Sequence, residues 1–165
     1  MYRVYRQLGL NQPRRTKPRL PKRPSLPVFV SEGPNEVWSA DFMSDALYHG
    51  SRFRTLNIID DFNREALAIE IDTSLRAERV IRVLERLKTE RDLPHMIRVD
   101  NGPEFLAHCL QDWGKANRVL IYYIQPGRPT QNAFIERFNR TYRNEVLDPY
   151  LFRNLEDVRR SPRNG

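Results

Sequence analysis

Apolar residues recur in short blocks from residue 37 onward, and their spacing predicts the elements of one folded unit. Three blocks bounded by polar or turn residues predict strands at 37–43, 53–59 and 66–71, and later blocks predict strands at 96–99 and 119–124. Apolar residues at helical spacing predict three helices. These begin near residues 77, 103 and 130, and the last two follow Gly- and Pro-rich turns.

The resulting order is βββαβαβα. Hairpins followed by alternating strands and helices predict an α/β fold with a mixed five-stranded sheet and helices on its faces. In the second helix, the spacing predicts one apolar face made of Leu106, Cys109, Leu110 and Trp113. In the third, it predicts a core stripe that includes Ile135, Phe138, Tyr142 and Val146. Trp38 and Trp113 are expected in the core.

The charge is divided unevenly along the 165 residues. The chain has 28 Lys and Arg against 21 Asp and Glu, a net charge of +7. Residues 1–23 hold eight of the basic side chains and no acidic one, so the remainder is close to neutral. Six prolines between residues 11 and 34 disfavour regular structure there. We therefore expect a basic arm and linker over residues 1–35 and a folded core over residues 36–160.

Composition excludes several classes of protein. No apolar run approaches the roughly 20 residues that a membrane-spanning helix needs, and no apolar signal-peptide core follows the basic start. The single cysteine, Cys109, excludes an internal disulfide and suits a reducing cytoplasm. The basic surplus favours an anionic partner such as DNA.

Three carboxylates stand at unusual places in the predicted elements. Asp41 lies inside the first strand, Asp100 ends the fourth, and Glu136 lies early in the last long helix beside its core stripe. Each has an ordinary interpretation: a solvated edge residue, a turn-former, and a partner for Arg140. Together, however, they can converge on one edge of a mixed sheet, where carboxylate oxygens suit Mg²⁺ or Mn²⁺.

Other acidic residues are expected to be structural. Asp60 and Asp61 precede Asn63 and Arg64 between two strands, which favours turn chemistry. Glu104 falls in a first helical turn, where it would favour the helix dipole. Asn132, Arg140 and Arg143 are expected to share the helical face of Glu136.

The carboxylates and their surroundings resemble a known family. Asp100 and Glu136 are separated by 35 residues, and Asp41 precedes them on a first strand. Together with the segments around these three residues and residues 56–62, this resembles the bacterial OrfB-type insertion-sequence transposases, which have an integrase catalytic core. The resemblance covers about residues 36–160. It implies an RNase H-like fold and the Asp-Asp-35-Glu chemistry of DNA integration and transposition.

The resemblance also implies a site and partners. Asp41, Asp100 and Glu136 are the expected catalytic residues and ligands of two Mg²⁺ or Mn²⁺ ions, with Asp41 bridging both. DNA, as element ends and target, is the expected partner, with a homo-oligomer and a helix-turn-helix protein from an upstream frame as further partners. A bacterial cytoplasmic, nucleoid-associated protein is expected. The predicted phosphate contacts are Arg128, Arg137, Arg140, Arg143, Arg14, Arg15 and Lys17.

The ends of the chain depart from the family pattern. Residues 2–8 and the linker resemble only the last piece of a helix-turn-helix region, and the segment after residue 159 lacks the further helix that the family carries. We therefore expect a core that is truncated at its C-terminus. Two alternatives stay open: an inactive DNA-binding transposase remnant, and an RNase H-like nuclease that cuts DNA without joining it.

Overall fold

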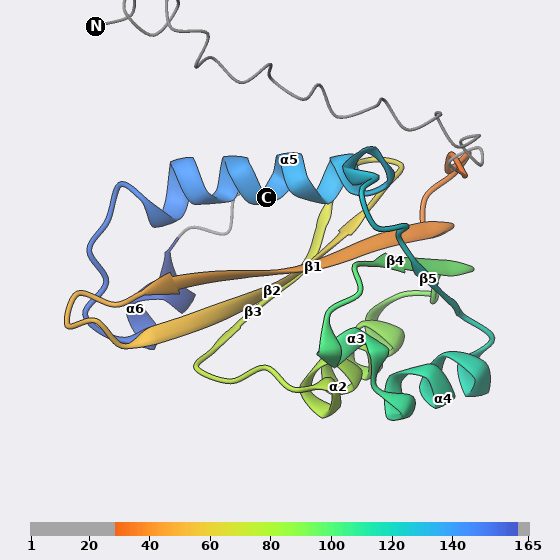
Figure 1. Ribbon diagram of the computed structural model, residues 1–165, viewed down its shortest axis with the longest axis horizontal. Helices are drawn as coiled ribbons and strands as arrows, with labels where there is room; N and C mark the ends of the chain where they lie inside the picture. Colours follow the sequence, from red (N-terminus) through yellow and green to blue (C-terminus); the bar gives the residue numbers. More distant parts are fainter. Residues whose placement is uncertain (1–28, 162–165) are drawn as a thin grey trace, which may run out of the picture.

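A five-stranded mixed sheet forms the centre of the computed structural model, which describes residues 29–161 (Figure 1). The strands are β1 (Val37–Ala46), β2 (Arg52–Asp60), β3 (Ala66–Asp72), β4 (Met96–Val99) and β5 (Leu120–Tyr123), in the spatial order β3-β2-β1-β4-β5. The first three pair antiparallel, whereas β4 pairs parallel with both β1 and β5. The predicted mixed sheet is confirmed.

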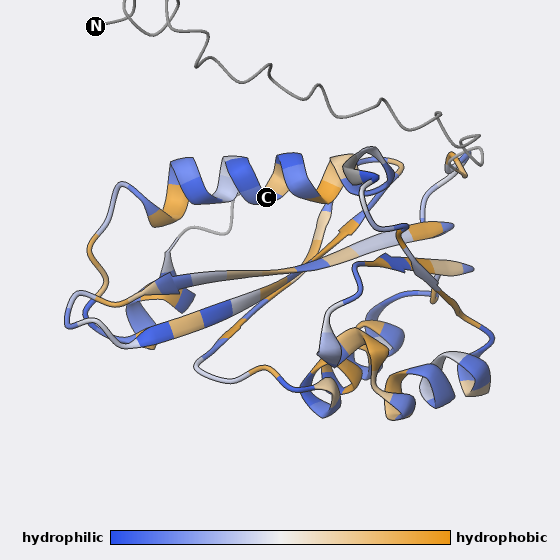
Figure 2. Cartoon of the chain, viewed as in Figure 1, coloured by the Kyte–Doolittle hydropathy of each residue, from blue (hydrophilic) through white to orange (hydrophobic). Residues whose placement is uncertain are grey.

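Helices cover both faces of this sheet. One face carries α2 (Ala77–Glu90), α3 (Pro103–Leu106) and α4 (His108–Asn117), and α5 (Ala133–Tyr142) runs along the other (Figure 1). A 3-10 turn, η1 (Pro129–Asn132), leads into α5, and a π-helix, η2 (Arg143–Leu147), continues it. A short helix, α6 (Leu155–Arg160), packs against β3. Hydrophobic and hydrophilic residues alternate along α2 and α5, as expected for helices with one face on a sheet (Figure 2).

The side chains of β1 alternate between two hydrophobic clusters. Trp38 and Ala40 join the cluster under α2, α3 and α4, whereas Met43 joins the one under α5. Because successive strand residues point to opposite faces, the odd-numbered residues of β1 lie on the α5 face. Asp41 is therefore placed on the α5 face by strand periodicity.

The predicted core is confirmed except in the second helix. Trp38 and Trp113 are buried, as are Ile135, Tyr142 and Val146 of the last helix, with Phe138 packed partly buried against them. Leu106 and Cys109, in contrast, are exposed, so their assignment to the apolar face was wrong.

A break between α3 and α4 is the reason. Ala107 has an extended backbone, with φ −59° and ψ 136°, which ends α3 and starts α4 in a new direction. The carbonyls freed by the break accept side-chain hydrogen bonds instead: Phe105 O from Tyr123 Oη at 2.7 Å, and Leu106 O from Gln111 Nε2 at 2.9 Å. A carbonyl that is buried or partly buried needs a hydrogen-bond donor, and here both donors lie outside α3.

Candidate metal and DNA site

Two of the three predicted carboxylates are placed by the pairing of β1 with β4. This parallel pairing covers only Val37–Ser39 opposite Met96–Arg98, and its last pair joins Ser39 to Arg98. Asp41 and Asp100 each lie two residues beyond that pair. Side chains two residues apart share a face of a strand, so both carboxylates fall at one level on the α5 face. Here β4 ends and the chain turns away, with Gly102 N donating to Asp100 Oδ1 at 2.9 Å.

Glu136 reaches the same region from the first turn of α5. Its helix packs on β1 and β2, and Asn139, one turn further along, donates from Nδ2 to Asp41 Oδ2 at 2.8 Å. Glu136 is exposed, whereas Asp41 and Asp100 are half-buried. The structure thus brings together β1, the end of β4 and the start of α5, and each contributes one predicted carboxylate.

The three carboxylates interact electrostatically. Burial is the main reason that the pKa of Asp41 rises from its ordinary 3.8 to about 6. The negative charges of Asp100 and Glu136 raise this pKa further, while hydrogen bonds from Phe42 N and Asn139 oppose the rise. A group of acids that repel one another in this way is stabilised by a cation placed among them.

The donor set fits a hard divalent cation in its chemistry. All three side chains offer carboxylate oxygens, the ligands that Mg²⁺ and Mn²⁺ prefer. Within residues 29–161, no three His, Cys, Asp or Glu side chains are gathered tightly enough to hold a metal ion as they stand. The structure therefore shows the three acids on one face, and their role as ligands stays a prediction.

Asparagines that sequence reasoning gave no role hold Asp41 in place. Asn57 in β2 is the register partner of Asp41, and its Nδ2 donates to Asn139 Oδ1 at 2.7 Å. Asn139 in turn donates to Asp41, which makes a relay from β2 through α5 to β1. The signal was present in the sequence: Asn57 interrupts an apolar strand, and Asn139 stands four residues after Ile135 on the buried stripe.

Asn132 was expected on the face of Glu136 but is buried. It ends η1 rather than continuing the helix, and this turn directs its side chain inward at 3% exposure. Its Oδ1 has no hydrogen-bond partner within the described residues. The helical-face prediction was wrong for this residue because the regular helix starts only at Ala133.

The basic residues predicted to bind DNA fall into four groups. Arg137 and Arg140 are exposed on α5. Arg143 donates to Ser44 O at 3.0 Å and lies 3.7 Å from Asp45 Oδ2, which fastens it to the end of β1. Arg128 is half-buried in the turn before η1. Arg14, Arg15 and Lys17 lie outside the described residues, as does most of the expected arm.

The acidic residues expected to be structural do more than was predicted. Asp60 Oδ1 accepts from Phe62 N at 2.9 Å, which is turn chemistry as expected. Asp61 instead forms a buried ion pair with Arg98 at 2.9 Å, so for this residue the turn interpretation was wrong. Glu104 lies in the first turn of α3, as expected, and also pairs with Arg54 of β2.

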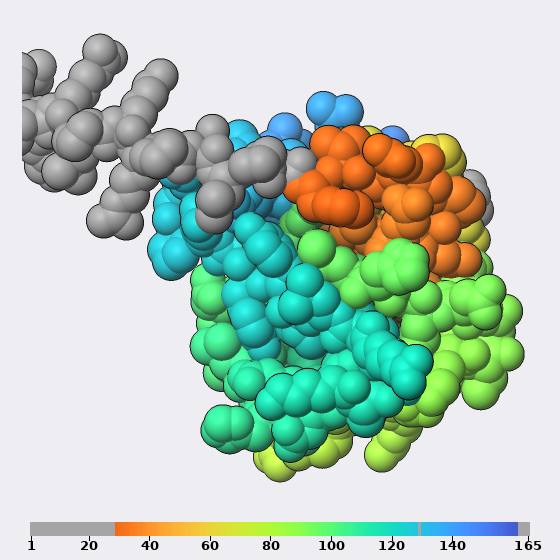
Figure 3. Space-filling model, turned by 90° about the vertical axis from the view of Figure 1, so that its right-hand side faces the viewer, coloured from red at the N-terminus to blue at the C-terminus, as the bar shows by residue number. Residues whose placement is uncertain are grey.

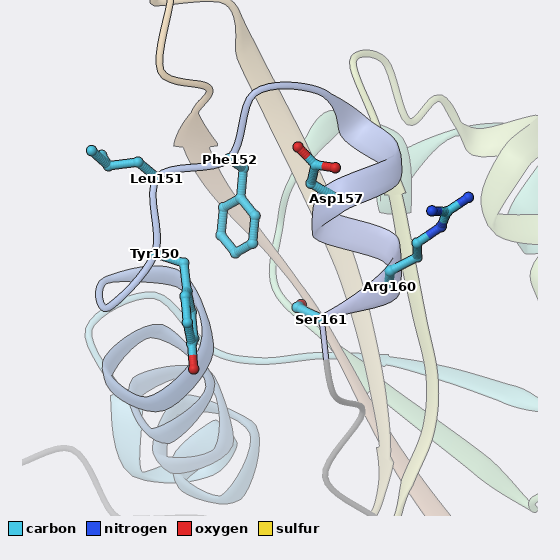
Figure 4. Close-up of a pocket in the computed structure, with 6 residues that line it drawn as sticks. All are labelled: Tyr150, Leu151, Phe152, Asp157, Arg160 and Ser161. Atoms are coloured by element: carbon cyan, nitrogen blue, oxygen red, sulfur yellow. The ribbon is translucent and has the colours of Figure 1, made fainter.

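A separate surface pocket of about 400 Å³ lies beside α6 and contains none of the predicted site residues (Figure 4). Its walls are formed by Tyr150, Leu151, Phe152, Asp157, Arg160 and Ser161. Asp157, its acidic member, accepts a hydrogen bond from Arg153 N at 3.2 Å and lies in the first turn of α6.

In the part of the chain that the structure describes, no helix is both long and apolar enough to cross a membrane.

Comparison with solved structures identifies the fold. The chain aligns with a simian T-cell lymphotropic virus intasome at a TM-score of 0.67 and 18% identity, over 84% of this chain and 51% of that one. It aligns with the dimeric form of the HTLV-2 integrase catalytic core domain in complex with magnesium at a TM-score of 0.58 and 19% identity, over 72% and 73%. The predicted RNase H-like fold is confirmed.

Sequence comparison identifies closer relatives. The insertion element IS407 uncharacterized 31.7 kDa protein of Burkholderia multivorans is 41% identical over 159 residues, which are 96% of this chain and 57% of that protein. The insertion element IS476 uncharacterized 39.2 kDa protein of Xanthomonas euvesicatoria is 36% identical over 159 residues, 96% of this chain and 46% of that protein. The chain spans about half the length of these relatives.

Family models agree with these relatives. Residues 31–129 match a family model described as the integrase core domain, and residues 117–162 match a second model of the same description. The first match alone covers more than half of the chain. The chain therefore belongs to the integrase core domain family, which confirms the resemblance to insertion-sequence transposase cores read from its motifs.

Proposed function

We propose that this chain is the catalytic core of an insertion-sequence transposase, which cleaves DNA strands at element ends and transfers them to target DNA. The observation that supports the proposal is that Asp41 and Asp100 lie at one level on the face of the sheet that α5 covers, and that α5 carries Glu136. Family membership supports phosphoryl transfer in DNA as the reaction class. Because the chain spans about half of its relatives, the activity of the whole protein is part of the proposal.

Asp41, Asp100 and Glu136 would hold the two Mg²⁺ or Mn²⁺ ions. When bound, such ions activate the attacking oxygen and stabilise the leaving oxygen of an in-line displacement at phosphorus. The HTLV-2 integrase core that shares this fold was solved in complex with magnesium, which supports the choice of ion.

The other residues of the site orient the acids. Asn139 and Phe42 N each donate to one oxygen of Asp41, which fixes the plane of its carboxylate. Gly102 N donates a hydrogen bond to one oxygen of Asp100. Such fixed hydrogen bonds hold the charges in place before substrate arrives. Glu136 is exposed and would approach the substrate from α5.

The DNA backbone would lie along α5. Arg137 and Arg140 are exposed there, and Arg143 and Arg128 extend the basic surface at either end of the helix. Phosphate contacts of this kind position DNA without reading its sequence. Arg14, Arg15 and Lys17 would add contacts from the arm.

We also propose that the active form is a homo-oligomer. HTLV-2 integrase cores of this fold were solved in dimeric and trimeric forms, which supports assembly through the core. A helix-turn-helix partner protein stays a prediction from sequence, as does a nucleoid location.

The proposal is tested with labelled DNA that carries the element ends and Mg²⁺ or Mn²⁺. Metal-dependent cleavage and joined products are expected, and Glu136→Gln should abolish both. Glu145→Gln, an exposed acid on η2, is the matched control and should leave both intact. Equal products from wild type and Glu136→Gln would contradict the proposal.

The products also separate the two alternatives. A nuclease of the same fold would cut the DNA without joining 3′ ends. A DNA-binding remnant would bind DNA in a salt-sensitive manner and give no metal-dependent product.

A further inference from the structure

A buried ion pair connects β4 with the end of β2 on the α5 face of the sheet. Arg98 Nη1 donates to Asp61 Oδ2 at 2.9 Å, and each side chain is only 3% exposed. Ser39 in β1 donates from Oγ to the other oxygen of Asp61 at 2.6 Å. Removing two charges from water costs about as much as their attraction returns, so such a pair is weak evidence for stability. Its presence therefore calls for another explanation.

Arg98 also fastens the segment that precedes β1. Its Nη2 donates to Phe29 O at 2.9 Å. Nearby, Asn35 N donates to Asp60 Oδ2 at 2.7 Å. Figure 3 shows the end of the molecule where the chain enters β1: the first described residues, in orange, lie on the same side as α4 and β5, in teal. One guanidinium thus joins β4 both to the β2 end and to the entry into β1.

The position of Arg98 in the pairing gives these contacts their importance. Arg98 and Ser39 form the last of only three residue pairs between β1 and β4. Asp100 and Asp41 follow, each two residues further on the same face. A slip of one residue between strands would turn Asp100 to the opposite face. So short a pairing has few backbone hydrogen bonds to prevent that slip.

We propose that Arg98 is a positioning residue: its buried contacts with Asp61 and Phe29, together with the hydrogen bond from Ser39 to Asp61, fix the register of β4 so that the Asp100 carboxylate lies at the level of Asp41. The inference rests on the proposed function, because it concerns how the proposed site is aligned. Because its side chain is only 3% exposed, Arg98 is assigned a role through Asp100.

The double variant Asp61→Asn/Arg98→Met tests the proposal, because it removes both charges while keeping similar volumes. Neutral replacement of a buried ion pair often leaves stability unchanged. Three quantities are measured: the urea midpoint, the Mn²⁺ affinity by calorimetry without DNA, and kcat and KM for cleavage of an element end. We expect an unchanged urea midpoint, Mn²⁺ binding weakened at least about tenfold, and a lower kcat with KM for DNA unchanged.

The matched control is Glu70→Gln/Arg79→Met. This pair joins β3 to α2, with Arg79 Nη2 and Glu70 Oε1 2.7 Å apart, away from the three acids. Its loss should leave the Mn²⁺ affinity within about twofold of wild type, as expected for sites that share no partners. A second variant, Arg98→Lys, keeps the charge but lacks the planar fork that serves Asp61 and Phe29 together. It should give an intermediate loss of affinity.

The outcomes separate the two proposals. Wild-type protein that neither binds Mn²⁺ nor cleaves DNA contradicts the proposed function. Active wild type with variants that bind Mn²⁺ equally well overturns the positioning role of Arg98. The positioning role is also overturned if the loss of Mn²⁺ affinity in either variant is fully explained by its unfolded fraction, since Arg98 would then contribute only to stability.

Discussion

Asn139 donates its side-chain amide to Asp41 Oδ2 across 2.8 Å, which joins the middle of α5 to the middle of β1. The same asparagine accepts from Asn57 Nδ2 at 2.7 Å. Asp41 is thus oriented by a side chain that stands one turn after Glu136, so the positions of these two acids are coupled through a single helix.

Asn139→Ala removes this coupling. The change leaves the buried Asn57 amide with only the weak acceptor Met43 Sδ at 3.2 Å and removes one donor to Asp41, so we expect a stability loss of about 1–3 kcal/mol. Cleavage should fall by more than the unfolded fraction accounts for, because Asp41 loses its fixed orientation. Urea denaturation and single-turnover cleavage measure the two effects. Asn144→Ala, an exposed asparagine on η2, is the control, and an equal effect there would contradict the prediction.

Asp41 should make the stability of the metal-free protein depend on pH. Its folded pKa of about 6 lies above the ordinary 3.8, chiefly because of burial, so the folded state binds the proton more tightly than the unfolded chain. The stabilisation from this proton is complete below about pH 3.8 and is lost as the pH rises through 6.

Urea denaturation of wild type and Asp41→Asn in chelator checks the sign. Relative to the variant, wild type should lose stability between about pH 4 and pH 6 and change little above pH 7. The ¹³C shift of the Asp41 carboxyl should titrate over the same range. A stability difference that rises with pH would contradict the assignment.

Arg54 and Glu104 should be coupled in stability. Arg54 pairs with Glu104 and lies over the ring of Phe42, with its guanidinium carbon 4.3 Å from the ring centroid. Burial alone would raise the pKa of Glu104, but the hydrogen bond from Arg54, a hydrogen bond from the backbone of Glu104 and the charge of Arg54 together outweigh it and lower this pKa. Arg54 and Glu104 therefore stabilise the fold together at neutral pH, and this contribution is lost as acid protonates Glu104.

A double-mutant cycle with Arg54→Ala and Glu104→Gln measures this coupling. We expect about 0.5–1 kcal/mol at pH 7, because both side chains are only partly exposed, and less in acid. The exposed pair Arg160 and Glu156 on α6 is the control and should give about 0.3–0.5 kcal/mol or less. Equal coupling at the two sites would show that the packing on Phe42 adds nothing.

Arg137 and Arg140 should account for part of the salt dependence of DNA binding. If each contacts one phosphate, Arg137→Ala and Arg140→Ala should each reduce the slope of log K against log salt by about 0.7–0.9. Arg82→Ala on α2, which is exposed but on the opposite face of the sheet, should leave the slope unchanged. Equal slopes for wild type and all three variants would show that DNA does not bind along α5.

Much of the fold followed from local pattern. Strands β1 to β4 and helix α2 lie where apolar spacing placed them, and the motif around Asp100 and Glu136 was enough to indicate the family to which the chain belongs. The break at Ala107 did not follow, because it depends on carbonyls that Tyr123 and Gln111 satisfy from outside α3. The spacing of apolar residues within one segment does not show which hydrogen-bond partner another element will provide.

The sequence by itself determined the order of the elements, the three acidic side chains and their spacing, since periodicity and motif are properties of neighbouring residues. Only the tertiary structure decided what holds those acids. The positions of Asn57 and Asn139 in the sequence indicate burial, but neither these positions nor those of Asp61 and Arg98 indicate that Asn57 meets Asn139 and that Asp61 meets Arg98. Burial makes each of these polar groups require a partner, and that partner is set by strand register and helix packing rather than by chain order.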